Sequence, residues 1–219
     1  MAIKPILFNT EMVRAILDGR KTCTRRVIKP QPDEKHTYPL GFVTDSTEKK
    51  NVGCFGFGID EYGGSIQYIK PPYGYAPGDI LYIRETWKKA PNGYYYYEDW
   101  QRNDIADVTK WKPSIHMPKE AARIWLKVTD VRVERLQEIT EDGAWQEGTD
   151  CWDDACYADN GWHPTFEDPD SGGNCDIIAG FEKLWNSTIK KSDLDRYGWD
   201  ANPYVWVVSF ERCEKPEDE

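Results

Sequence analysis

Six basic side chains gather in a short segment near the start of the chain: Arg14, Arg20, Lys21, Arg25, Arg26 and Lys29. The chain as a whole carries a formal net charge of −10, whereas proteins that grip long duplex DNA through its phosphates show the opposite balance. Local positive charge can still hold one nucleotide or a short strand. The segment therefore predicts a nucleoside or short single-stranded RNA as partner and argues against strong binding to duplex DNA.

A second set of residues with possible chemistry lies between 149 and 175, in an acidic, glycine-rich stretch: Cys151, Cys156, His163 and Cys175. Four such ligands satisfy tetrahedral zinc. The spacing nevertheless matches no paired C-x2-C pattern, and a cysteine in a reducing compartment is usually a small buried hydrophobe. We expect no metal and no cofactor. The sequence also lacks a P-loop, a Rossmann glycine fingerprint and a Ser-His-Asp arrangement.

Aromatic residues make up 14% of the chain, with 10 Trp and 13 Tyr. Most of them suit the half-buried surfaces of β-sheets. Others are candidates for platforms on which nucleobases stack. Among these we single out Trp87, Trp199 and His116 for base recognition, although each is equally suited to a structural role.

The elements around the basic segment follow from local pattern. The apolar run 5–8 predicts a strand, and apolar residues at helical spacing over 12–17 predict a helix that Thr10 caps. Gly19 ends this helix with a residue that tolerates positive φ. Lys21 therefore leaves a helix end and enters the next strand or loop, which is a suitable position for a polar site.

Further along, a tight turn at 77–79 opens a strand over 80–83, and 123–136 carries the clearest strand signal. A break in its alternation at Thr129-Asp130 predicts a bulge. The remaining expected elements are a hairpin or loop in 88–110, short helices at 140–148 and 177–185, and a strand at 205–210. Strands outnumber helices and no βαβ alternation is present, which favours a small barrel decorated by helices.

We expect one domain over 1–213, with insertions at about 30–75 and 149–175 and an acidic tail at 214–219. No apolar signal stretch or membrane-spanning segment is evident. A cytoplasmic location follows as an expectation, with six cysteines as free thiols.

The segment 16–26 resembles the helix and G-x-K-T-x-T-x-R opening of ASCH domains, and 77–81 is similar to their second turn and strand. Thr140, Glu141, Ala144 and the pair Gln146-Glu147 match a later helix of the bacterial N4-acetylcytidine amidohydrolase in that superfamily. Other parts of the chain resemble the larger phage and prophage ASCH proteins: 84–87, 114–118, Trp199, Asn202-Pro203 and Trp206. The resemblance implies an α+β fold, a PUA-like mixed β-barrel decorated by short helices.

The resemblance also implies a site. Lys21, Thr24 and Glu147 match the proposed catalytic residues of the amidohydrolase. A threonine hydroxyl needs a neighbouring base, and a lysine accepts a proton near neutral pH only when it is desolvated or set among cations. Residues expected to contact the ligand are Arg20, Arg26, Arg84, Glu85, Trp87, His116, Trp199 and Asn202.

Two functions remain open. One is an amidohydrolase acting on N4-acylated cytidine through Lys21, Thr24 and Glu147; the other is a non-catalytic RNA- or nucleotide-binding module, such as a phage accessory factor. Lys21 could also simply pair with Glu147 or a phosphate. We expect the three residues to face one cleft that Trp87, His116 or Trp199 helps to line. We also expect Lys21 to form a surface ion pair worth roughly 0–1 kcal/mol.

Overall fold

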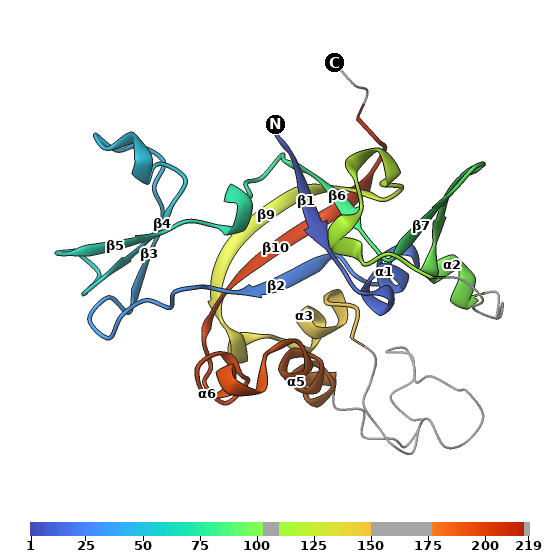
Figure 1. Cartoon of the computed structure of the whole chain (residues 1–219). Helices are drawn as coiled ribbons and strands as arrows, with labels where there is room; N and C mark the ends of the chain where they lie inside the picture. The colour runs from blue at the N-terminus through green and yellow to red at the C-terminus, as the bar shows by residue number, and fades with distance from the viewer. Residues whose placement is uncertain (103–109, 150–176, 217–219) are drawn as a thin grey trace.

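The computed structural model describes residues 1–102, 110–149 and 177–216. This part of the chain is α+β, with three sheets and short helices arranged around them (Figure 1). None of its helices is long and apolar enough to cross a membrane.

The main sheet has five strands in the order β1-β6-β9-β10-β2. Their bounds are β1 Ile3–Leu7, β2 Cys23–Val27, β6 Ile80–Arg84, β9 Trp125–Arg135 and β10 Tyr204–Cys213. β1 runs parallel to β6, and the other neighbours are antiparallel. The sheet is open, with β1 and β2 as its two edges, so the described strands form a strongly curved sheet instead of the closed barrel that we expected (Figure 1).

The bulge predicted at Thr129-Asp130 is confirmed. Ser209 pairs with Asp130 whereas Phe210 pairs with Val128, so Thr129 is an extra residue on β9. An extra residue on one strand of an antiparallel pair bends the sheet and increases its twist. The two longest strands, β9 and β10, curve together across the molecule (Figure 1).

The helices are α1 Thr10–Leu17, α2 Tyr97–Arg102, α3 Glu141–Gln146, α5 Ile177–Thr188 and α6 Leu194–Tyr197. Three of them, α1, α3 and α5, lie close to their predicted positions, whereas α2 and α6 were not predicted. In the view of Figure 1, α3, α5 and α6 lie near the lower end of β9 and β10. Asn9, one residue before the predicted cap, accepts the Met12 N–H at 2.8 Å and caps α1. Gly19 follows α1 with φ of 79°, as expected for a residue that ends a helix. Single 3-10 turns connect other elements: Lys49–Asn51, Pro72–Gly74, Ser114–His116, Lys119–Ala121, Leu136–Glu138 and Lys191–Asp193.

The expected loop over 30–75 instead contains a three-stranded antiparallel sheet of β3 Tyr38–Phe42, β4 Phe55–Gly58 and β5 Ile66–Ile69. The sequence of β4 alternates Phe and Gly, a pattern too short and too glycine-rich to identify. Phe55 packs against Trp206 and Phe57 against Tyr204, with ring centroids 6.1 and 5.0 Å apart. The small sheet therefore shares the core of the main sheet. A hairpin of β7 Trp87–Ala90 and β8 Gly93–Tyr96 occupies part of 88–110, as expected.

The main sheet buries both faces, as the alternation of β10 shows. Trp206, Val208 and Phe210 belong to the apolar cluster that contains the small sheet and α1. Val205 and Val207 belong to a second cluster formed with α3 and α5. The edge strand β2 lies between these two clusters, and side chains on its opposite faces reach different surroundings.

Candidate functional site

Lys21 and Glu147, 126 positions apart, are in direct contact. The Lys21 Nζ donates to Glu147 Oε2 and to the Glu147 backbone oxygen, each at 2.7 Å. Their side chains are 0% and 4% exposed. Lys21 is therefore part of a buried ion pair, and the expectation of a surface pair was wrong.

The pair is positioned by the close packing of two helix ends. Lys21 follows α1, and Glu147 is the C-cap residue of α3. Gly148, with φ of 75°, then turns the chain. A Cβ at Gly148 would lie 2.6 Å from the Cβ of Ala15 and 3.0 Å from that of Lys21. Only glycine fits here, both for its conformation and for the close approach of the two helix ends.

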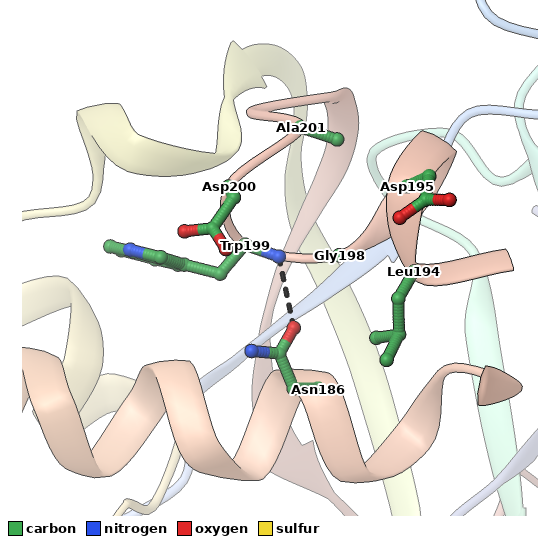
Figure 2. A pocket seen from close by; sticks show the side chains of 7 residues that line it. All are labelled: Asn186, Leu194, Asp195, Gly198, Trp199, Asp200 and Ala201. Atoms are coloured by element: carbon green, nitrogen blue, oxygen red, sulfur yellow. Dashed lines mark hydrogen bonds between the residues drawn. The ribbon is translucent and has the colours of Figure 1, made fainter.

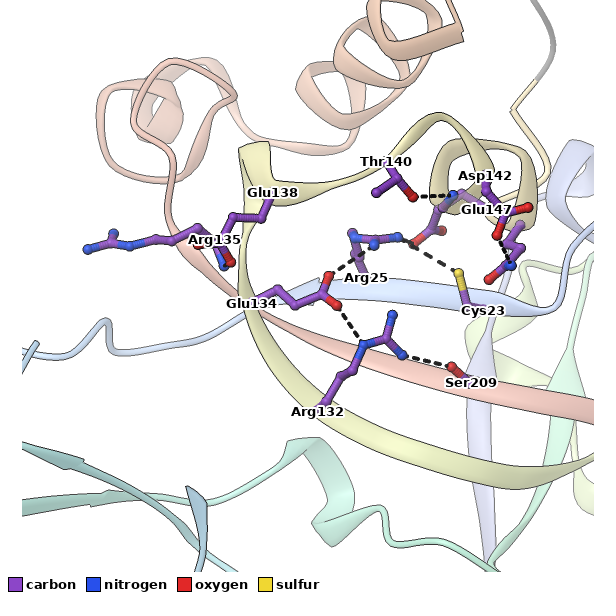
Figure 3. A network of polar contacts seen from close by, with 12 residues as sticks. Cys23, Arg25, Arg132, Glu134, Arg135, Glu138, Thr140, Asp142, Glu147 and Ser209 are labelled. Carbon is purple, nitrogen blue, oxygen red and sulfur yellow. Dashed lines mark hydrogen bonds and ion pairs between the residues drawn. The ribbon is translucent and has the colours of Figure 1, made fainter. Parts of the chain in front are cut away.

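Glu147 contacts a second cation, which sequence reasoning missed. Arg25 Nη1 lies 3.3 Å from Glu147 Oε1, and Arg25 Nη2 donates to Glu134 at 3.0 Å. Arg132 then donates from Nε to Glu134 and from Nη1 to the Ser209 hydroxyl (Figure 3). Charges of alternating sign thus lead from the buried Lys21 to Arg132, whose side chain is 41% exposed.

This cluster has unused hydrogen-bonding capacity. The buried Arg25 Nε and Thr149 Oγ1 have no hydrogen-bond partner. Thr24 is 2% exposed, and its hydroxyl makes no hydrogen bond with any residue in the described ranges. Lys21 has three N–H donors and uses two of them on Glu147. Because buried polar groups are normally satisfied, these open positions are candidates for hydrogen bonds to water or a ligand.

Phe8 links this cluster to the other face of β2. The Lys21 Nζ lies 5.6 Å from the centre of the Phe8 ring, and the Arg26 guanidinium lies 5.5 Å from the same centre. Arg26 Nη2 also donates to the Leu7 oxygen at 2.9 Å, joining the edge strand β2 to the end of β1. The cluster therefore lies beside β2, at one edge of the main sheet.

Burial shifts the pKa of two polar side chains of β2, Cys23 and Arg26. Burial raises the pKa of Cys23 to about 12, with a further contribution from Glu147 that Lys21 and Arg25 oppose. Cys23 is therefore a neutral thiol and a poor nucleophile. Burial also lowers the pKa of Arg26, while Glu147 acts in the opposite direction; a guanidinium nevertheless stays charged in proteins.

The other residues expected to contact a ligand lie in different places. Arg20 is nearest, donating to the Gly148 oxygen at 3.2 Å. Trp87 is buried in an apolar cluster with Met117 and Trp125. His116 is exposed. Neither of these last two is brought to Lys21, and their roles as ligand residues stay predictions.

Arg84 is the last residue of β6 and Glu85 follows it, and both make contacts with nearby segments. Arg84 donates to the backbone oxygens of Ile115 and Met117. Both oxygens of Glu85 accept from Arg123, at 2.9 and 3.0 Å, and burial raises the pKa of Glu85. These two side chains hold β6 to its neighbours in the described structure.

Trp199 and Asn202 belong to the turn between α6 and β10. Asn202 has φ of 43°, and its Oδ1 accepts the Gln137 N–H at 2.9 Å. Trp199 packs against Phe181 with ring centroids 6.2 Å apart. Trp199 also helps to line a hollow of about 320 Å³ beside Asn186, whose Oδ1 accepts the Trp199 N–H (Figure 2). This hollow is separate from the Lys21 cluster.

Metal ligation is not evident within the ranges that the structure covers, where no group of three or more His, Cys, Asp or Glu side chains could hold an ion. Cys151, Cys156, His163 and Cys175 lie outside these ranges. Cys23, Cys54 and Cys213 are free thiols.

Sequence reasoning missed Phe8 and Thr149 as well as Arg25. The alternation of β2 could have placed Arg25 on the face opposite to Thr24, but no local pattern links Glu147 to β2. No protein-family model, curated protein or solved structure matches this chain.

Proposed function

We propose that this chain is an ASCH-type protein of PUA-like architecture that binds a nucleobase or nucleoside at the cluster of Lys21, Thr24 and Glu147. The observation that carries the proposal is the buried Lys21–Glu147 pair. Thr24, three residues after Lys21, is also buried, and its hydroxyl has no hydrogen-bond partner among the described residues. The resemblance selected Lys21 and Glu147 from positions 126 apart in sequence, and their contact supports that selection. We also propose a cytoplasmic location, which suits the free thiols Cys23 and Cys54.

The energetics of the pair favour a role beyond stability. Removing two charges from water costs several kcal/mol per ion, and apolar residues of similar volume often stabilise a fold as well or better. Here the pair is accompanied by further unsatisfied polar atoms, Arg25 Nε and Thr149 Oγ1. A cluster that existed only to stabilise the fold would be expected to satisfy its own members.

The free hydrogen-bonding positions suit the edge of cytosine. Cytosine offers an amino donor at N4 and acceptors at N3 and O2. Glu147 keeps lone pairs that can accept from the amino group, because each of its oxygens contacts one cation. The third N–H of Lys21 and the Thr24 hydroxyl can donate to the ring acceptors.

Hydrolysis of an N4-acylated cytidine is compatible with this arrangement. In the reaction that we propose, Glu147 takes a proton from a water molecule, which attacks the acyl carbon. Lys21 donates a hydrogen bond to the oxygen that becomes negatively charged. The C–N bond then breaks, N4 receives the proton from Glu147, and cytidine leaves with a carboxylic acid, which releases its remaining proton to solvent. Lys21 acts as a donor here, because it already donates twice to Glu147.

A non-catalytic binding module is the second candidate, and the burial of Lys21 favours it. The Lys21 side chain has no exposed surface, so a ligand reaches it only when a covering side chain moves. The Phe8 ring lies 5.6 Å from Lys21 Nζ, and Arg26 lies 5.5 Å from the same ring, so we propose that these two side chains move. A protein that opens for binding alone would show the same cluster.

The test is incubation of N4-acetylcytidine with the protein, followed by liquid chromatography, alongside calorimetric titration with cytidine. We compare wild type with Lys21→Met and Thr24→Val, and use Lys127→Met as the control because Lys127 is 53% exposed. Loss of hydrolysis in the first two variants alone supports the amidohydrolase. Cytidine binding without hydrolysis, lost in Lys21→Met, supports the binding module. Hydrolysis that survives Lys21→Met removes Lys21 from the mechanism, and absence of both activities contradicts the proposal.

A further inference from the structure

Arg26 differs from several other arginines in lacking a carboxylate partner among the described residues. Ion pairs to Asp or Glu are formed by Arg14, Arg20, Arg25, Arg123 and Arg132. Among the described residues, Arg26 makes one side-chain hydrogen bond, to the Leu7 backbone oxygen, and no ion pair. A guanidinium carries five N–H donors. In a chain of net charge −10, this partly exposed cation next to the proposed site is available to an anion.

Tyr73 presents an aromatic ring on the same side of the molecule. It is 65% exposed and packs against Tyr75, with ring centroids 5.6 Å apart and an angle of 32° between the planes. The Tyr75 hydroxyl donates to the Pro5 oxygen of β1 at 2.6 Å, which fixes the inner ring. Arg26 donates to the Leu7 oxygen of the same strand, so Arg26 and the tyrosine pair both lie along β1. One face of Tyr73 is therefore backed by protein while much of the ring remains open to solvent.

The backbone at Tyr73 is unusual for such a residue. Its φ of 52° and ψ of 12° lie in the left-handed region, which bulky side chains rarely adopt. Glycine would fit this position without strain. Strained conformations of this kind gather at functional sites, and here the conformation holds an exposed ring next to Arg26 and β1. The Lys70 side chain lies beside Gly74, where it adds positive charge.

We propose that Arg26 and Tyr73 form a second subsite for a nucleic-acid strand, in which Arg26 binds the phosphate next to the base held at Lys21 and Tyr73 stacks on the following base. This inference rests on the proposed function and narrows it: the ligand is a base within a single strand. Guanidinium groups match phosphate geometry, and exposed aromatic rings stack on bases of any identity. The acidic remainder of the chain excludes a long duplex, as the sequence indicated.

The experiment measures fluorescence anisotropy of a labelled pentacytidylate and calorimetric binding of cytidine and cytidine monophosphate. The variants are Tyr73→Ala, Tyr73→Phe, Arg26→Gln and Arg26→Lys. The control is Tyr62→Ala, because Tyr62 is even more exposed, at 86%, and lies outside this arrangement. Circular dichroism and thermal midpoints establish that each variant is folded.

We expect the strand to bind at least tenfold more tightly than cytidine. Tyr73→Ala should weaken strand binding by about 5- to 100-fold, the usual range for loss of one stacked base, and leave cytidine binding unchanged. Tyr73→Phe and Tyr62→Ala should match wild type. Arg26→Gln should lower the slope of log affinity against log salt by about 0.7, as for one phosphate on a single strand, and Arg26→Lys should retain that slope with weaker binding.

Any of three results overturns the inference without affecting the proposed function. One is cytidine binding with no gain for the strand. Another is a strand affinity that is equal to that of the monophosphate and insensitive to Tyr73→Ala. The third is strand binding that falls equally in Tyr62→Ala, because stacking would then lack a specific site. If neither cytidine nor the strand binds, both proposals fail together.

Discussion

Two clusters of acidic and basic side chains, each built around a buried carboxylate, differ in how completely their members are hydrogen-bonded. In the first, Arg123 donates to both oxygens of Glu85 and both oxygens of Asp99, at 2.7 to 3.0 Å, and its guanidinium lies 4.1 Å from the Tyr96 ring centre. In the second, Lys21 and Arg25 share Glu147, while Arg25 Nε and the Thr149 hydroxyl stay unpaired.

This difference distinguishes a structural clamp, formed by Arg123 with Glu85 and Asp99, from a candidate site, formed around Lys21 and Glu147. The Arg123 cluster ties β6 to α2 and β9 and uses nearly every donor that it has. The Lys21 cluster keeps donors and acceptors that a ligand could use, at the open edge of the main sheet. Burial of charge is therefore a weak guide to function, whereas incomplete hydrogen bonding within a buried cluster is a stronger one.

The largest effect should come from breaking the clamp. Arg123→Ala leaves Glu85, whose side chain is 3% exposed, without its partner. We expect a loss of about 3–5 kcal/mol in the free energy of unfolding, as for other buried pairs with one partner removed. Urea unfolding measures this loss. Lys127→Ala is the exposed control, for which we expect a loss of roughly 0–1 kcal/mol in the free energy of unfolding. Below the unfolding transition, cytidine affinity should match wild type; a weakened affinity would place the clamp in the binding site.

Removing Lys21 should affect stability less and binding more. In Lys21→Met, Glu147 retains Arg25, so we expect a loss of about 1–3 kcal/mol, the usual penalty for one buried unsatisfied group. Cytidine affinity should fall at least tenfold. Urea unfolding and calorimetry on the same preparation give both numbers. If stability falls but affinity does not, the second cluster is another clamp.

Alkaline pH gives a test of the Cys23 environment. Its folded pKa of about 12 exceeds the usual 9.0, so above pH 9 the unfolded chain releases a proton that the folded chain keeps. Stability should therefore fall between pH 9 and pH 12, by at most about 1.4 kcal/mol per pH unit for this group. Cys23→Ala should make the decline shallower by this amount. An unchanged slope would show that Cys23 ionises equally in both states.

The smallest change in stability should come from Thr24→Val, which replaces a hydroxyl by a methyl group of similar shape. Because the Thr24 hydroxyl has no hydrogen-bond partner among the described residues, unfolding free energy should change by less than about 0.5 kcal/mol. Cytidine affinity should nevertheless fall about tenfold, for loss of one hydrogen bond. Thr24→Ser, which keeps the hydroxyl, should bind as wild type. Equal affinity in Thr24→Val would remove Thr24 from the site.

Local pattern predicted much of the fold. The helix that ends at Gly19, the bulge at Thr129 and the strands β6, β9 and β10 follow from periodicity and turn residues. The small sheet over 38–69 was missed, because its middle strand alternates Phe with Gly and is stabilised by contacts to Trp206 and Tyr204 far away in sequence. Tertiary contacts of this kind leave no local signal.

The candidate site was also predicted only in part. The helix end brought attention to Lys21 and Thr24, and resemblance added Glu147. The depth of Lys21 could not be read from its neighbours, because it depends on Gly148 allowing the ends of α1 and α3 to touch. Arg25 was named only as one of six basic side chains in the segment, whereas the structure shows that its side chain is 3% exposed and contacts both Glu147 and Glu134.

The most direct test of the central claim is a crystal structure of the protein soaked with cytidine. The account predicts a base next to Phe8, with ring or carbonyl acceptors within hydrogen-bond distance of Lys21 Nζ and Thr24 Oγ1 and the N4 amino group donating to Glu147. Cytidine bound instead at the Arg123 clamp or in the hollow beside Trp199, with the Lys21–Glu147 pair unchanged, would contradict it.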